Sequence, residues 1–139
     1  MARTTKFIAH PTDDQMDKFP KEVQHLIKKG KEQGFVTHQE LLKAMPHIED
    51  DLILLDETGK QLSSEDLAKF IQARANGSTK NIVFLIGGAY GVSEAVKKRA
   101  NYTWSLSKLV FPHQLVRLIL DEQVYRACSI NRNEKYHHS

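Results

Sequence analysis

The sequence predicts an α/β fold built around a parallel sheet, and three neighbouring segments carry that prediction. Leu52–Leu55 and Asn81–Ile86 are unbroken apolar runs, which is the pattern of strands buried on both faces. Between them, Leu67, Phe70 and Ile71 recur at helical spacing. A strand, a helix and a second strand within about 35 residues form a parallel βαβ unit, whose crossover we expect to be right-handed.

Polar residues mark the limits of this unit. Asp56–Lys60 has the composition of a turn and is expected to end the first strand. Ser63, followed three residues later by Asp66, predicts the N-cap of the helix, and Gly77 predicts its end.

The first fifty residues are expected to be mainly helical. Lys6–Ala9 could form a short strand, and Pro11–Asp14 is expected to be a turn. Apolar residues at helical spacing predict a helix over Pro20–Gln33. A capping-box pattern predicts a second, shorter helix over Gln39–Ala44, which would stop before the next proline.

Glycines follow the second strand. In open α/β sheets ligands bind at the carboxyl ends of the strands, and glycines there allow a ligand to approach the backbone closely. The loop Gly87–Gly91 matches neither the dinucleotide nor the phosphate-loop spacing, so by itself it is more typical of a tight structural turn than of a ligand site. A helix is expected from Ser93 to about Ala100.

The last predicted helix follows Pro112 and runs from Leu115 to about Cys128. Its apolar positions are too numerous for one narrow stripe. We therefore expect this helix to be covered on two sides, and a partner subunit could supply one of the covers.

Composition indicates one domain in a reducing compartment. The chain has 139 residues, of which 40% are apolar, enough for a single modest core. The lone cysteine, Cys128, excludes an internal disulfide and is typical of cytoplasmic proteins. No apolar run approaches the roughly 20 residues of a spanning helix, so neither a membrane nor an export segment is expected.

Charge is concentrated in the C-terminal third. The net charge is only +3, but residues 97–139 carry eight basic side chains against three acidic ones. This region is the expected face for a polyanion, although a solvated basic surface without a ligand explains the same pattern. The basic residues are Lys97, Lys98, Arg99, Lys108, Arg117, Arg126, Arg132 and Lys135.

Several motifs follow one another in a characteristic order over residues 51–139. They are Leu54–Lys60, Leu62–Glu65, Phe84–Gly91, Arg99–Asn101, Ser105–Lys108, Phe111–Arg117, Glu122–Ala127 and Tyr136-His137. Together they closely resemble the RlmH-type methyltransferases, a SPOUT-class family that methylates N3 of a pseudouridine in large-subunit (23S) ribosomal RNA.

The resemblance implies a SPOUT-type parallel sheet whose C-terminal chain threads through a loop as a trefoil knot. It also implies S-adenosyl-L-methionine bound in the knot, a homodimer that acts on the ribosome, and no metal. The cofactor contacts carried over by position are Leu55, Gly87, Leu106, Ser107, Lys108, Leu109, Val110 and Phe111.

The same resemblance implies the residues near the target base. Tyr136 and His137 are expected there, with His113 and Arg126 as further catalytic candidates. Arg132 and Arg117 are the candidates for contact with RNA. A histidine can take up a proton near neutral pH whereas an arginine cannot, but no single base is assigned. His113 could equally be a structural residue at a helix start.

Residues 1–50 depart from this family, whose members begin with two strands that are not evident here. Residues 19–50 resemble instead the first region of bacterial primary sigma factors. The prediction is therefore an atypical helical segment, 1–50, before a methyltransferase region, 51–139. Without those strands an apolar edge and face of the sheet would be uncovered. The alternative function is a binding or regulatory module on a non-catalytic knotted scaffold.

Overall fold

The computed structural model describes residues 13–33, 36–44, 50–87 and 91–138. The predicted strand at Lys6–Ala9 lies outside these ranges, and so does the first half of the predicted turn at Pro11–Asp14. The second half of that turn is wrong, because Asp13 and Asp14 begin a short helix. The elements are α1 (Asp13–Met16), α2 (Lys21–Gln33), α3 (His38–Ala44), β1 (Asp50–Gln61), α4 (Ser64–Asn76), β2 (Asn81–Ile86), α5 (Glu94–Arg99), β3 (Tyr102–Ser105) and α6 (His113–Asn131).

The described strands form one parallel sheet in the order β2-β1-β3. The predicted pairing of the two apolar runs is confirmed, with Asp50 opposite Asn81 and Leu55 opposite Ile86. β1 is central, and its Leu52–Leu55 segment is fully buried, as predicted. β2 lies at the edge of the described sheet. Its alternate side chains pack against both cores but remain only half-buried, so the predicted burial on both faces is confirmed in part.

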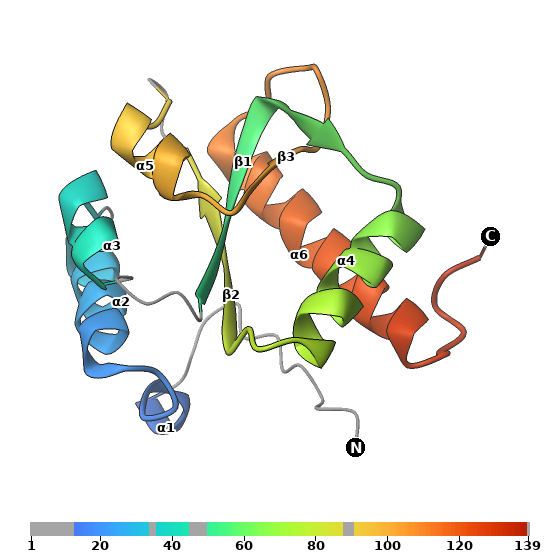
Figure 1. Ribbon diagram of the computed structural model, residues 1–139, viewed down its shortest axis with the longest axis horizontal. Helices are drawn as coiled ribbons and strands as arrows, with labels where there is room; N and C mark the ends of the chain where they lie inside the picture. Colours follow the sequence, from blue (N-terminus) through green and yellow to red (C-terminus); the bar gives the residue numbers. More distant parts are fainter. Residues whose placement is uncertain (1–12, 34–35, 45–49, 88–90, 139) are drawn as a thin grey trace.

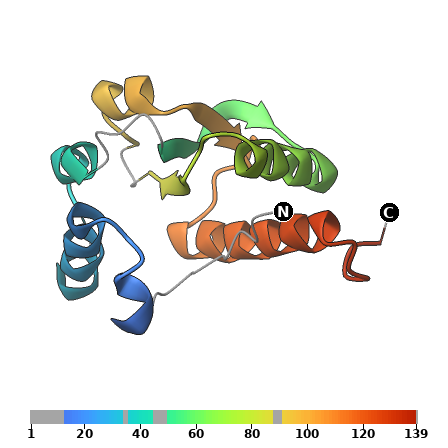
Figure 2. The ribbon, with the colours of Figure 1, turned by 60° about the horizontal axis from the view of Figure 1, so that its bottom comes forward.

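Alternate side chains of β1 enter two separate cores. Ile53 and Leu55 pack with α4 and α6 on one face of the sheet. Leu52 packs on the other face with Leu41 of α3 and Leu26 of α2. Figures 1 and 2 show these layers, with α2, α3 and α5 on one side of the strands and α4 and α6 on the other. The period-two alternation of a strand thus produces a three-layer arrangement.

The helices α2 and α3 confirm the two helix predictions in the N-terminal part. The side chain of Glu40 accepts a hydrogen bond from the Thr37 backbone N–H, and the Thr37 hydroxyl accepts one from the backbone of Glu40, which is a complete capping box. Lys29 of α2 forms an ion pair with the same Glu40. Together the two helices cover the sheet face that was expected to be bare.

The predicted turn at Asp56–Lys60 is wrong, because β1 continues through this segment to Gln61. The turn chemistry is nevertheless present: the Asp56 carboxylate accepts hydrogen bonds from the backbone and hydroxyl of Thr58. These bonds produce a bulge rather than a strand end. Trp104 of β3 lies opposite both Leu55 and Lys60, so the pairing resumes beyond the bulge.

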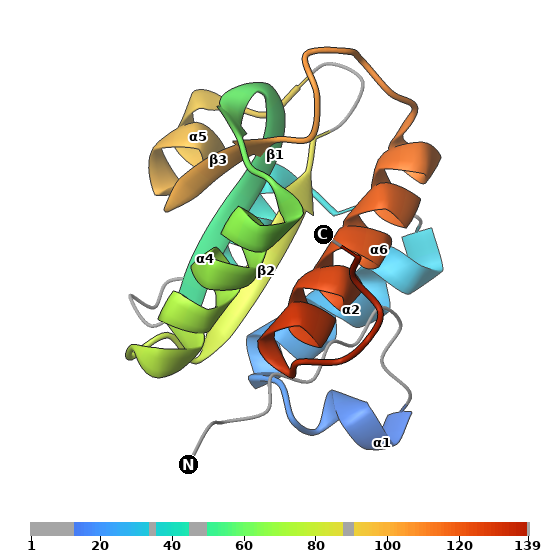
Figure 3. The same cartoon turned by 90° about the vertical axis from the view of Figure 1, so that its right-hand side faces the viewer.

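Both helices that flank β2 begin at the predicted caps. The Ser63 hydroxyl accepts from the Asp66 backbone N–H at the start of α4, and Ser93 does the same for Val96 at the start of α5. α6 begins earlier and ends later than predicted. The segment from Leu106 to Pro112 connects β3 to α6 and passes over the end of the sheet (Figure 3). None of the described helices is long and apolar enough to cross a bilayer.

Candidate active site

A cavity of about 610 Å³ opens at the carboxyl ends of β1 and β2, a volume within the roughly 300–1,000 Å³ range of small-molecule sites. The crossover to α6 forms its opposite wall. The lining residues are Leu55, Asp56, Glu57, Ile86, Gly87, Gly91, Trp104, Leu106, Ser107, Leu109, Val110, Phe111, Pro112, His113 and Val116.

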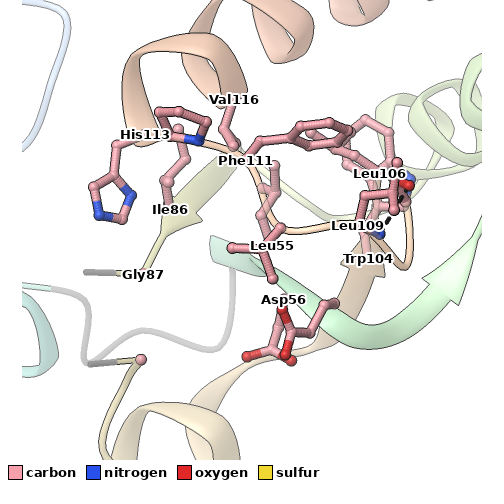
Figure 4. A pocket seen from close by; sticks show the side chains of 15 residues that line it. Leu55, Asp56, Ile86, Gly87, Trp104, Leu106, Leu109, Phe111, His113 and Val116 are labelled. Atoms are coloured by element: carbon pink, nitrogen blue, oxygen red, sulfur yellow. Dashed lines mark hydrogen bonds between the residues drawn. The ribbon is translucent and has the colours of Figure 1, made fainter. Parts of the chain in front are cut away.

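Apolar side chains make up most of the wall. Leu55 lies in the middle of the labelled side chains in Figure 4, with Ile86 and His113 on one side and Leu106 and Leu109 on the other. Trp104 is buried beneath them. A wall of this kind can pack against a flat apolar surface.

The segment after β3 is held in a defined shape by its own serines. The buried Ser105 hydroxyl donates to the Ser107 carbonyl at 2.9 Å. The Ser107 hydroxyl accepts from the Leu109 backbone N–H at 3.0 Å. These two bonds fold the chain back within five residues, so that Leu106, Ser107 and Leu109 all line the cavity.

Two carboxylates from the bulge of β1 lie on the lining of the cavity, and neither was predicted as a site residue. The two hydrogen bonds from Thr58 lower the pKa of Asp56 below its usual range, so its carboxylate remains ionised near neutral pH. Glu57 is the next residue. Their position directly after a buried apolar run was a usable signal, because ligands bind at the carboxyl ends of parallel strands.

Most of the predicted cofactor positions come together in this cavity. Leu55, Gly87 and the Leu106–Phe111 segment line it, except for Lys108, whose side chain is exposed and is not part of the lining. His113 also lines it, from the first residue of α6.

The other predicted catalytic residues lie elsewhere. They gather near the C-terminal end of α6. The guanidinium carbon of Arg126 lies 4.9 Å from the ring centre of Tyr136, and a guanidinium nitrogen of Arg126 contacts His137. Arg126 comes thirteen positions after His113 in α6, which is roughly 20 Å along the axis. Within one chain, the cavity and this C-terminal group are therefore two separate places.

The two predicted RNA contacts are both on the surface. Arg132 is exposed and pairs with Glu134 at 2.8 Å. Arg117 is exposed on the first half of α6. Among the residues that the structure describes, no three His, Cys, Asp or Glu side chains are grouped as a metal ion would require.

Comparison with known proteins gives one family and a consistent set of relatives. The family model described as "Predicted SPOUT methyltransferase" matches residues 3–137. The relatives include three proteins named ribosomal RNA large subunit methyltransferase H. The one from Cytophaga hutchinsonii is 54% identical over 89 residues, which are 64% of this chain and 57% of the relative.

The other two matches are longer. The protein from Geotalea daltonii is 47% identical over 100 residues, or 72% of this chain and 65% of the relative. The protein from Clostridium botulinum is 45% identical over 109 residues, or 77% of this chain and 69% of the relative. The chain thus spans only 57% of the length of the Cytophaga relative, and the same share of a relative with the same name from Christiangramia forsetii.

Proposed function

Because this chain belongs to the SPOUT methyltransferase family, we propose that it transfers a methyl group from S-adenosyl-L-methionine to N3 of a pseudouridine in 23S ribosomal RNA. The single observation that carries the proposal is the cavity in which Gly87 meets the Leu106–Phe111 segment. We also propose that the chain forms the family's trefoil knot, in which the crossover to α6 is the threaded part. We further propose that the protein acts on the ribosome in the cytoplasm.

The residues that line the cavity fit this cofactor. Apolar side chains around Leu55 would enclose the adenine, and the backbone near Gly87 and Leu109 would orient it. The ionised Asp56 carboxylate provides a counter-charge for a sulfonium or an α-ammonium group. The site therefore combines an apolar wall for a neutral ring with a negative charge for a cationic centre.

S-Adenosyl-L-methionine, when bound, supplies an electrophilic methyl group. The chain must hold the pseudouridine so that N3 lies in line with that group, and it must let the N3 proton leave as the new N–C bond forms. His113 lines the cavity from the first residue of α6 and is a further candidate for contact with the base. Tyr136, His137 and Arg126 are the residues proposed to hold the base.

We further propose a homodimer in which the C-terminal residues of one chain complete the cavity of the other. Its support is the separation of roughly 20 Å between His113 and Arg126 within one chain. In addition, α6 has an uncovered apolar face: Leu115, Leu118 and Tyr125 are 41%, 66% and 48% exposed. A second copy packed against this face would bury it and bring a partner tail to each cavity.

RNA phosphate is the proposed partner of the basic C-terminal part. Arg117 and Arg132 are exposed and lie on or next to α6. Because phosphate contacts position the nucleic acid without reading its sequence, these arginines would hold the ribosomal RNA while the cavity selects the base.

Calorimetry and methyl transfer test this function on the full chain. We expect saturable binding of S-adenosyl-L-methionine and transfer of its labelled methyl group to 70S ribosomes that lack the modification. The new group should be at N3 of a pseudouridine when the RNA is digested and analysed by mass spectrometry. Absence of saturable binding would leave a regulatory module on a non-catalytic scaffold as the better interpretation.

A mixing experiment tests the shared site. We expect deletion of residues 136–139 to abolish methylation, and we expect the pocket variant Gly87→Val to abolish it too. In a mixed dimer, the chain that lacks residues 136–139 contributes an intact cavity, and the Gly87→Val chain contributes an intact tail. Together they form one complete site. Mixing the two inactive variants, unfolded and refolded together, should therefore restore roughly a quarter of the wild-type activity. If each chain uses its own tail, the mixture stays inactive.

A further inference from the structure

The segment that follows α6 folds back over the molecule and is held at several points. The backbone of Asn133 has a φ of 56°, in the left-handed region that reverses the chain after a helix. The Glu134 backbone N–H donates to the Ser129 carbonyl at 2.9 Å. The chain then returns beside α6 toward α4, so that residues near the C-terminus meet the first turn of α4 (Figure 3).

His137 is held from both sides of its ring. Its Nε2 lies 2.8 Å from a carboxylate oxygen of Glu65, and its Nδ1 lies 3.3 Å from a guanidinium nitrogen of Arg126. A guanidinium can only donate hydrogen bonds, so Nδ1 must accept and carries no proton. The proton of the neutral ring is therefore on Nε2, where it is donated to Glu65.

Both partners of His137 are themselves fixed. Arg126 donates to Glu122 through two nitrogens, at 2.9 and 2.5 Å, and Glu122 also accepts from the Tyr136 hydroxyl at 3.3 Å. Glu65 lies in the first turn of α4, two residues after the Ser63 cap, where the helix N-terminus favours negative charge. The contacts of Glu65 with its own backbone N–H and with His137 lower the pKa of its carboxyl group.

The geometry points to Glu65 as a positioning residue for the methyl transfer. We infer that it fixes His137 as the Nε2–H tautomer and anchors the tail, so that the ring and the neighbouring Tyr136 are presented to the target base in a set orientation. This inference rests on the proposed function, because Glu65 acts through its contact with His137, a residue that the proposed reaction uses.

The inference also specifies which nitrogen of the His137 ring is able to accept a proton. With Nε2 committed to Glu65, the only lone pair of His137 is on Nδ1, which faces Arg126. A proton taken from N3 of the base would enter the ring at Nδ1, once the Arg126 guanidinium moves from Nδ1 to the base that it helps to hold. The resulting imidazolium would stay paired with the Glu65 carboxylate, as in other histidine–carboxylate pairs.

Variants at Glu65 test this role with a neighbour as control. Glu65→Ala should lower kcat on 70S ribosomes by roughly 10- to 100-fold, because supporting contacts of a site residue have effects of that size. Glu65→Gln keeps a carbonyl acceptor for Nε2–H and should recover a large part of the rate. Asp66→Asn removes the same charge from the same turn of α4 and should leave kcat unchanged. Equal rates for Glu65→Ala and wild type would overturn the inference.

Nitrogen NMR of the His137 ring gives a readout that needs no methyl transfer. The wild-type protein and Glu65→Gln should show the Nε2–H tautomer, whereas Glu65→Ala should show a mixture of tautomers. A mixture already in the wild type would overturn the inference whatever the activity. If the ring behaves as expected but the wild-type protein methylates nothing, the proposed function fails while the assignment of the Glu65 contact stands.

Discussion

Replacing Gly87 with valine is expected to abolish binding of S-adenosyl-L-methionine while the protein remains folded. Gly87 directly follows β2 and lines the cavity. A Cβ atom there would lie 3.3 Å from Cγ1 of Val92 and 3.7 Å from the backbone of Gly91. The two further methyl groups of valine must then displace this loop or enter the cavity. We expect affinity to fall roughly 100-fold or more, about 2.7 kcal/mol.

Calorimetry of the Gly87→Val protein provides the measurement, and Gly77→Val is its matched control. Gly77 is exposed at the end of α4, and its Cβ would meet neighbours only at ordinary distances of 3.5 and 3.6 Å. The control should bind the cofactor as the wild type does. Unchanged affinity in Gly87→Val would mean that the ligand does not approach the end of β2, and the pocket assignment would be wrong.

Replacing Gly59 with alanine should destabilise the whole sheet. Gly59 lies in the bulge of β1, where its Cβ would be 2.6 Å from the Thr103 carbonyl oxygen and 2.9 Å from the Trp104 carbonyl carbon. Both are backbone atoms of β3 and cannot rotate away. The two strands must separate locally, and Trp104 must shift within the core. We expect a loss of about 3 kcal/mol in the free energy of unfolding.

Urea denaturation followed by circular dichroism measures this effect. Gly77→Ala provides the comparison, because it also adds one methyl group to a glycine but does so at an open surface. Its free energy of unfolding should stay within about 0.5 kcal/mol of wild type. A similarly small change for Gly59→Ala would show that the close approach of β1 and β3 is relaxed in solution.

Local patterns in the chain were sufficient for most of the elements. Unbroken apolar runs predicted the paired strands β1 and β2, because burial on both faces leaves no polar position. Hydroxyl and carboxyl groups three residues apart predicted the starts of α3 and α4. β3 was not predicted: it has only four residues, and it is a strand because β1 lies beside it.

The cavity was predicted only in part. The resemblance to known methyltransferases led to Gly87 and the Leu106–Phe111 segment, which the structure brings together around Leu55. It did not lead to Asp56 and Glu57, because their composition predicted a turn. Their place on the cavity wall depends on the bulge, and the bulge depends on pairing with β3.

The sequence by itself determined the local elements, the apolar faces of the sheet and the family to which the motifs point, because these depend on the order and spacing of side chains. The tertiary structure alone decided which side chains meet across long separations. It placed α2 and α3 over the second face of the sheet, where Leu41 packs with Leu52. It also brought Glu65 to His137, 72 residues away, because packing of α4 against α6 determines where the returning tail can bind.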